Sequence, residues 1–273
     1  MIASSVELPH ETGRAFDTLA EEYDELFTRS VIGRAQRNVV WQRAANLFSI
    51  GDHILELNCG TGEDALYLSR LGASVIACDA SEQMIDFAKR RQQQEEPLAA
   101  VQFEILPTEQ LLKLRRAIPF DGVFSNFSGL NCVSDLAAVA EQLSQCVKDG
   151  APLLLCLSTR ICLWEIVYFL LRGDFRKAFR RCRGKTHARL GDISFSVQYP
   201  TISELKTLFA PAFSLRSYMG VGITVPPSYL ETWAVKHPGC LRLLQRIDET
   251  IAGWPGFRIV GDHVLLHFEK VRS

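Results

Sequence analysis

The stretch that decides the fold is His53-Ile54-Leu55-Glu56-Leu57-Asn58-Cys59-Gly60-Thr61-Gly62, a short apolar run that meets a glycine loop. Residues 64–71 follow with the apolar spacing of a helix that ends near Gly72. Glycines between a strand and a helix let backbone N–H groups approach a polar ligand closely, because no side chains stand in the way. The stretch therefore predicts a strand, a ligand-binding loop and a helix, in that order.

Strand and helix patterns alternate on both sides of this stretch. Two helices are expected within residues 16–48, before the first strand. Further strands are expected at 74–78, 101–106, 122–126, 151–158, 193–199, 215–219 and 264–268, with helices at 81–91, 135–147 and 203–209. Such alternation predicts an α/β fold with a doubly wound, parallel sheet.

Domain organisation is expected to be simple, since no repeat, low-complexity tract or linker divides the 273 residues. One domain is predicted over residues 1–273, with a helical cap at about 14–50. The regular pattern lapses at about 159–192 and 220–257, so these two segments are predicted to be lid-like insertions.

Composition excludes several classes of protein. Apolar residues make up 47% and charged residues 22% of the chain, which is typical of a folded globular protein. The formal charge of −1 gives no overall field that would attract nucleic acid. The eight cysteines form no Cys-x-x-Cys pair, so no metal site is expected. Cysteines within apolar runs and the absence of a signal-peptide pattern favour the cytoplasm.

Asp79 lies 19 residues after Gly60, at the end of the second expected strand. A carboxylate in that place can accept both hydrogen bonds of a ribose diol, so loop and acid together predict an adenosine ligand. Residues 60–65 also fit the loose Gly-x-Gly-x-x-Ala form of the NAD fingerprint. An NAD-dependent oxidoreductase and a non-catalytic adenosine-binding protein therefore remain alternatives at this point.

Four segments carry a resemblance to a known family. Residues 56–62 resemble motif I of the class I S-adenosylmethionine-dependent methyltransferases of small-molecule type, in which an acid precedes the glycines by this interval. Residues 77–84 are similar to the second motif, whose acid binds ribose and whose Met packs on adenine. Residues 120–126 resemble the fourth-strand motif, which ends beside the methyl-transfer point, and residues 20–24 are similar to the Tyr-Asp segment of the family's N-terminal helices.

The resemblance implies a Rossmann-like, doubly wound, mostly parallel seven-stranded sheet with helices on both faces and an N-terminal helical segment. It implies S-adenosylmethionine as the cofactor and direct in-line transfer of its methyl group to a small-molecule acceptor. One departure is Pro107, which stands where the family often has an acid for the adenine amino group, so Thr108 or Glu109 is assigned to that contact. The residues assigned to the cofactor are Tyr23, Glu56, Asn58, Gly60, Gly62, Asp79, Ala80, Met84, Thr108, Glu109 and Asn126.

The acceptor side is described less fully by the sequence. Residues 126–129 read Asn-Phe-Ser-Gly rather than Asn-Pro-Pro-Tyr, so a nucleic-acid acceptor is not expected. A missing Tyr-x-x-x-Lys pair counts against the short-chain dehydrogenases. None of the six histidines is assigned a catalytic role, and the catalytic residues are left open.

Residues 161–171 form an apolar run that is followed by eight basic residues and one acid between Arg172 and Arg189. The run is shorter than the roughly 20 residues that span a bilayer. One interpretation is a core helix with a solvated basic face. The other is a lid over an amphipathic or anionic acceptor, in which segment 161–189 also contacts a membrane surface. In that case phosphates would be attracted by Arg176, Lys177, Arg180 and Arg181.

Overall fold

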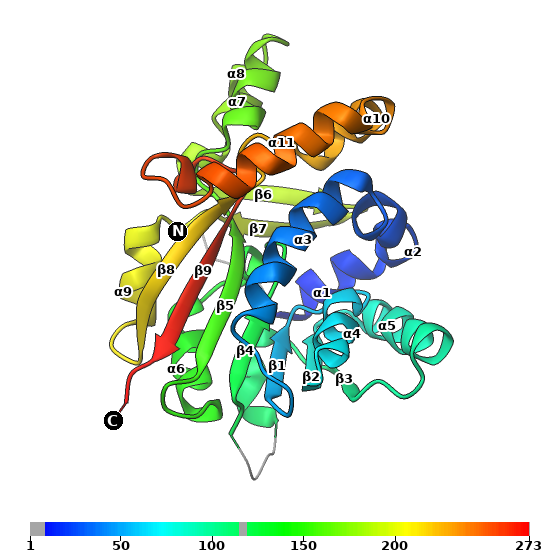
Figure 1. Ribbon diagram of the computed structural model, residues 1–273, viewed down its shortest axis with the longest axis vertical. Coiled ribbons are helices and arrows are strands. Elements are labelled where there is room, and N and C mark those ends of the chain that lie inside the picture. The colour runs from blue at the N-terminus through cyan, green and yellow to red at the C-terminus, as the bar shows by residue number, and fades with distance from the viewer. Residues whose placement is uncertain (1–8, 115–118, 273) are drawn as a thin grey trace, which may run out of the picture.

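The computed structural model describes residues 9–114 and 119–272, at whose centre lies a seven-stranded sheet in the order β3-β2-β1-β4-β5-β9-β8 (Figure 1). Strands β1 to β5 are parallel, and β9 is antiparallel to its neighbours β5 and β8. The mostly parallel, seven-stranded sheet is therefore confirmed. Its strands are β1 (His53–Leu57), β2 (Ser74–Asp79), β3 (Val101–Ile105), β4 (Gly122–Ser125), β5 (Pro152–Ser158), β8 (Phe213–Val221) and β9 (His263–Lys270).

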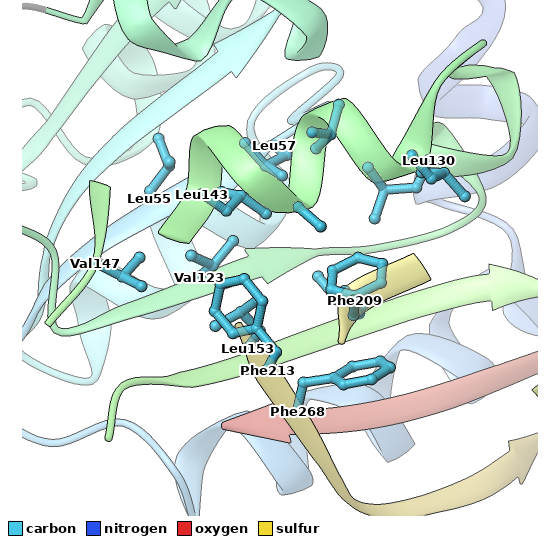
Figure 2. Close-up of a cluster of buried hydrophobic side chains, with 14 of the residues drawn as sticks. Leu55, Leu57, Val123, Leu130, Leu143, Val147, Leu153, Phe209, Phe213 and Phe268 are labelled. Carbon is cyan, nitrogen blue, oxygen red and sulfur yellow. The ribbon is translucent and has the colours of Figure 1, made fainter. Parts of the chain in front are cut away.

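Helices cover both faces of this sheet, because its central strands are apolar on both sides. On one face a core cluster joins the strands to α6 (Leu136–Cys146) and α9 (Ile202–Phe209), and Figure 2 shows Leu143 and Phe209 within it. On the other face a second cluster joins them to α3 (Val31–Ala45), α4 (Glu63–Arg70) and α5 (Glu82–Glu95). Ser81 caps α5 by accepting from the Met84 N–H at 3.1 Å, as its sequence predicts.

The N-terminal segment contains more elements than the two helices that the sequence predicts. It consists of α1 (Pro9–Asp17), α2 (Ala20–Tyr23), a π-helical turn η1 (Asp24–Thr28) and α3. Asp17 ends α1 by accepting from the Ser81 hydroxyl at 2.6 Å and from the Gln83 N–H at 3.1 Å, which ties α1 to the start of α5. Polar contacts of this kind accompany the division of the N-terminal segment into short helices. The spacing of apolar residues alone does not predict such contacts.

The two segments predicted to be irregular contain regular elements. Segment 159–192 holds α7 (Leu163–Leu170), α8 (Phe175–Ala178) and β6 (Lys185–Leu190), and β6 pairs with β7 (Ile193–Gln198) in a separate two-stranded sheet. Segment 220–257 holds α10 (Glu231–Lys236) and α11 (Pro238–Ile251). The short 3-10 turns are η2 (Thr108–Lys113), η3 (Gly129–Cys132), η4 (Arg181–Arg183), η5 (Ser228–Leu230) and η6 (Phe257–Ile259).

Residues 1–8, where no signal peptide is expected, lie outside the described residues. Over the described ranges no helix combines the length and the apolar character that crossing a membrane requires.

Candidate active site

A cavity of about 440 Å³ lies where β1, β2, β4 and β5 end, the edge at which doubly wound folds bind their ligands. Nine of the residues assigned to the cofactor from sequence line it, and Glu56 and Gly62 do not. The nine are Tyr23, Asn58, Gly60, Asp79, Ala80, Met84, Thr108, Glu109 and Asn126.

Asp79 connects the glycine loop with the loop after β2. One of its carboxylate oxygens accepts from the Gly60 N–H at 2.9 Å, and the other accepts from the Ser81 N–H at 2.9 Å. Burial raises the pKa of Asp79, and these two backbone hydrogen bonds act in the opposite direction. Each oxygen keeps another lone pair, so the carboxylate can still accept from a pair of hydroxyls.

Two hydrogen-bond acceptors near the loop lack donors among the described residues. They are Oε2 of Glu56 and Oδ1 of Asn58, which are both buried. Burial raises the pKa of Glu56 well above its ordinary value, and the nearby Asp64 carboxylate adds to the rise. Of the two, only Asn58 lines the cavity, and its buried oxygen without a donor indicates a ligand with N–H groups, of which the methionyl ammonium of S-adenosylmethionine provides three. The residues present therefore fit this cofactor.

Tyr23 lies against the glycine loop from the side of the N-terminal cap. A β-carbon placed on Gly60 would lie 3.7 Å from the Tyr23 ring. The next residue, Asp24, holds this arrangement by accepting from the Thr61 hydroxyl at 2.7 Å and from the Arg91 guanidinium. Burial raises the pKa of Tyr23 to about 12, so its phenol keeps its proton at neutral pH.

Gly62 has a different role from the one that the sequence suggests. A β-carbon at this position would lie 2.7 Å from Phe103 and 2.9 Å from Ala88, rather than in the cavity. The Gly62 N–H donates to the Cys59 carbonyl at 3.0 Å. Its missing side chain therefore permits close packing against β3 and α5, and of the two glycines Gly60 lines the cavity.

Strained backbone lies at the centre of the cavity, after β1 and β4. Asn58, Phe127 and Ser128 have positive φ values of 53°, 46° and 69°, which are unusual for residues other than glycine. All three line the cavity, and a β-carbon on Gly129 would collide with the Asn58 side chain. Backbone strain of this kind clusters at functional sites because the surrounding structure must hold it in place.

Asn126 lies at the carboxyl end of β4, where its sequence motif predicts it. Its amide nitrogen donates to Asp64 at 3.1 Å, and its oxygen accepts from the Phe127 N–H at 2.9 Å. Asp64 also accepts from the Arg37 guanidinium and from the Trp41 indole at 2.6 Å. These contacts fix the Asn126 side chain within the cavity, between the half at the ends of β1 and β2 and the half beside the β6–β7 hairpin.

His263 is a cavity residue to which the sequence analysis assigned no role. It begins β9, whose antiparallel direction brings its first residue beside Ser158, at the carboxyl end of β5. The His263 Nδ1 atom lies 3.7 Å from the Asp262 carboxylate. Burial lowers the pKa of His263, which keeps the imidazole neutral at pH 7. The antiparallel pairing of the last strand is the signal that would have revealed this position.

Arg180 and Arg181 do not offer free charges to a phosphate, which corrects the hypothesis drawn from the sequence. Both donate to the buried Glu165 carboxylate, at 2.6 Å and 3.0 Å respectively. Arg181 also donates to the Asp262 carboxylate at 2.8 Å. Their charges are therefore balanced inside the protein, and Arg181 joins segment 159–192 to the cavity.

An apolar wall completes the far half of the cavity. Inward-facing side chains of the β6–β7 hairpin form it together with α1, and the Phe16 and Phe195 rings lie 5.6 Å apart between centroids. The hairpin side chains that line the cavity are Ala188, Leu190, Phe195 and Val197. A flat or branched apolar ligand would fit against this wall.

Comparison with known proteins indicates a family. Residues 54–150, which run from β1 to the start of β5, match the family model described as Methyltransferase domain. The chain is 29% identical over 143 residues to the demethylmenaquinone methyltransferase of Leptospira interrogans serovar copenhageni, covering 51% of this chain and 57% of that protein. It is 30% identical over 156 residues to the demethylmenaquinone methyltransferase of Streptomyces avermitilis, covering 56% and 63%. The matched region thus spans less than two thirds of these relatives.

Solved structures share the fold at lower sequence identity. The S-adenosylmethionine dependent methyltransferase from Mesorhizobium loti has a TM-score of 0.55 at 16% identity, with 86% of this chain and 98% of that chain covered. The DhpI-SAH complex has a TM-score of 0.60 at 19% identity, with 99% and 100% covered. The [4+2]-cyclase SpnF has a TM-score of 0.63 at 12% identity, with 97% of each chain covered.

Proposed function

We propose, from the premise that residues 54–150 belong to the class I S-adenosylmethionine-dependent methyltransferases, that this protein moves the cofactor's methyl group to a small-molecule acceptor. One observation carries the proposal. The Asp79 carboxylate is held by the Gly60 and Ser81 N–H groups at the cavity, next to a buried Asn58 oxygen that has no donor among the described residues. This set offers acceptors to the ribose diol and to the ammonium of the cofactor.

Each cofactor residue has a proposed role. Asp79 accepts from the ribose hydroxyls, and Ala80 and Met84 lie beside the adenosine with Thr108 and Glu109 at the adenine end. Asn58 accepts from the ammonium, and Glu56 lies buried in β1, two residues before Asn58. Tyr23 closes the loop from the cap side, and Asn126 borders the methyl-transfer point. S-adenosylmethionine supplies an electrophilic methyl on a sulfonium, so the protein needs no covalent intermediate and acts largely by positioning.

His263 is proposed as the base for a hydroxyl acceptor. Nδ1 lies 3.7 Å from the Asp262 carboxylate and makes no hydrogen bond among the described residues, and a neutral imidazole has one ring nitrogen that can accept a proton. A neutral imidazole in the cavity can take the proton from a phenol or an enol as the oxygen attacks the methyl group. The apolar hairpin wall would hold the rest of such an acceptor, so we propose an amphipathic aromatic molecule.

We propose that the chain is one domain, with a cap and two lids over the cavity. The cap is segment 14–50, and the lids are segments 159–192 and 220–257. Support comes from Tyr23, Arg181 and Ser228, which bring these three segments to the cavity lining. The cytoplasm is the proposed location, in line with the eight free thiols.

Ligand-induced stabilisation tests the cofactor assignment. A ligand at 100 times its Kd adds about 2.7 kcal/mol to the unfolding free energy. For a chain of this size that is a rise of roughly 5–10 °C in Tm. S-adenosylmethionine and S-adenosylhomocysteine should give this rise, and NAD should not. A rise with NAD alone would support the oxidoreductase alternative.

A turnover assay separates an enzyme from a non-catalytic binder. Release of S-adenosylhomocysteine should be measured with matched phenols and anilines, because His263 is needed for the first class and not for an unprotonated amine. Cofactor binding without turnover of any acceptor would favour the binding protein. Since the cyclase SpnF shares the fold, the acceptor itself should also be analysed for rearrangement without methylation.

A further inference from the structure

A row of apolar side chains is exposed to solvent on α7, α8 and the turn between them. Figure 1 shows α7 and α8 projecting from the body of the protein beside α11, and the exposed apolar side chains on and between these helices are called the α7–α8 surface. Its members and their exposed fractions are Leu163 (43%), Val167 (51%), Leu171 (83%), Phe175 (66%) and Phe179 (45%). Apolar side chains gathered in this way mark a surface that contacts a partner.

The buried side of the same hairpin carries ion pairs. Glu165 is 1% exposed and binds the guanidinium groups of Arg180 and Arg181. Asp174 caps α8 by accepting from the Lys177 N–H at 3.0 Å. The ion pairs of Glu165 thus lie on the inner side of the hairpin, whereas Asp174, at the turn, is partly exposed.

A second group of exposed apolar side chains lies on the turn next to the base of α7. The Leu163 N–H donates to the Val260 carbonyl at 3.1 Å, which brings the turn around η6 next to the start of α7. This turn exposes three more large apolar side chains, Trp254, Phe257 and Ile259. Aromatic side chains at the edge of an apolar surface are typical of contact with the interfacial region of a bilayer.

Cations lie on the α7–α8 hairpin and on the residues that directly follow it. Four of them are exposed and take part in no salt bridge within the described parts of the chain, namely Arg172, Arg176, Arg183 and Lys185. The other four of the eight basic residues from Arg172 to Arg189 pair with Glu165, Asp174, Asp192 or Asp262, so the first four carry the excess positive charge of the stretch. Two copies of this surface would repel each other, so the charge favours an anionic partner over a second copy of the chain.

We propose that the α7–α8 surface docks on an anionic phospholipid bilayer. Leu171, Phe175 and their neighbours enter the interfacial region, and the four cations lie at the headgroup phosphates. The contact lies on one leaflet. It is independent of the proposed methyl transfer, since none of the five apolar side chains lines the cavity.

Sedimentation of the full chain with vesicles tests this surface. The parent should sediment with phosphatidylcholine–phosphatidylglycerol vesicles and much less with phosphatidylcholine alone, and added salt should release it. Replacing Leu171→Ser and Phe175→Ser together should lower the partition coefficient on the anionic vesicles about tenfold or more. The Arg172→Gln, Arg176→Gln pair should lose binding to the anionic vesicles and most of the salt dependence.

The chain offers a matched control. Ile50 and Leu98 are 87% and 97% exposed and lie in loops outside the α7–α8 surface, so Ile50→Ser with Leu98→Ser should leave sedimentation unchanged. Two measurements check that every variant is folded. One is circular dichroism, and the other is calorimetric binding of S-adenosylhomocysteine. The proposal is overturned if the parent does not bind the anionic vesicles, or if the control pair loses as much binding as the α7–α8 pair. It is also overturned if the parent is a dimer in solution that the α7–α8 pair converts to a monomer.

Discussion

At the scale of single residues, the candidate cofactor half is a place where carboxyl groups outnumber basic side chains. Glu56, Asp64 and Asp79 are grouped near one buried guanidinium, that of Arg37. Arg37 is committed to Asp64, so the other two carboxyls have no basic side chain as a hydrogen-bond partner among the described residues. Such a site favours a cation, and the sulfonium and ammonium of S-adenosylmethionine are both cationic.

Asp79→Asn should weaken cofactor binding. The change removes the charge from the proposed diol contact, and a hydrogen bond to a charged group contributes about 1.5–3 kcal/mol, or roughly 10- to 100-fold in Kd. Calorimetry with S-adenosylhomocysteine measures the loss. Asp86→Asn, on the exposed side of α5, serves as the control. An unchanged Kd in folded Asp79→Asn protein would remove Asp79 from the site.

Glu56→Gln should raise stability at alkaline pH and leave cofactor binding nearly unchanged. Burial raises the folded pKa of Glu56, so the folded chain holds this proton more tightly than the unfolded chain does. Stability is therefore lost as pH rises from the ordinary glutamate range through the raised pKa. The variant has no such loss and should unfold at higher urea than the parent at pH 8, while its cofactor Kd stays close to the parent's, because the replaced carboxyl holds a proton and does not line the cavity. A variant that is less stable than the parent at pH 8 contradicts this account.

At the scale of elements, the sequence predicts best what is buried and local. Strands β1 to β5 are apolar runs bounded by turn residues, and these were located correctly. The strand β6 was missed because Lys185, His187 and Arg189 face solvent and hide the inward row. The helix α11 was missed because Pro238-Gly239 resembles a turn, although proline is tolerated in the first helical turn. His263 reaches the cavity through antiparallel pairing, which local sequence does not encode.

Experiments should distinguish the roles of the two loop glycines, Gly60 and Gly62. Gly62→Ala places a methyl group against Phe103 at a φ of 79°, and the combined overpacking and strain should lower the unfolding free energy by about 2–4 kcal/mol. Gly60→Ala meets only the strain of about 1–2 kcal/mol but points into the cavity. Urea unfolding should thus show the larger loss of stability for Gly62→Ala. Calorimetry should show that Gly60→Ala loses more cofactor affinity relative to its loss of stability. If Gly60→Ala lost more stability and Gly62→Ala lost more affinity, Gly62 would be the glycine that lets the ligand approach the backbone.

At the scale of the whole molecule, two histidines on β9 make stability depend on pH. Burial lowers the folded pKa of His263 and of His267, so the unfolded chain binds more protons than the folded chain below the ordinary histidine value. Stability is therefore present above about pH 6.5 and declines as pH falls toward the lowered pKa values. His263→Asn should reduce the decline of the unfolding free energy between pH 7 and pH 5. His187→Asn, on an exposed β6 position, should leave it as in the parent, and an equal slope in all three proteins would exclude His263 as the cause.

The place of β9 between β5 and β8 has a consequence for biosynthesis. The ribosome makes β8 before β9, but β8 has no partner in the central sheet until β9 pairs with it. During this interval the apolar strand β5 presents an open edge, which is a hazard for association with other nascent chains. The glycine loop and Asp79 are complete long before then, whereas Asp262 and His263 arrive with β9. A nascent chain can thus gain its cofactor half early, and the cofactor would then stabilise the intermediate during the interval in which β5 is most exposed.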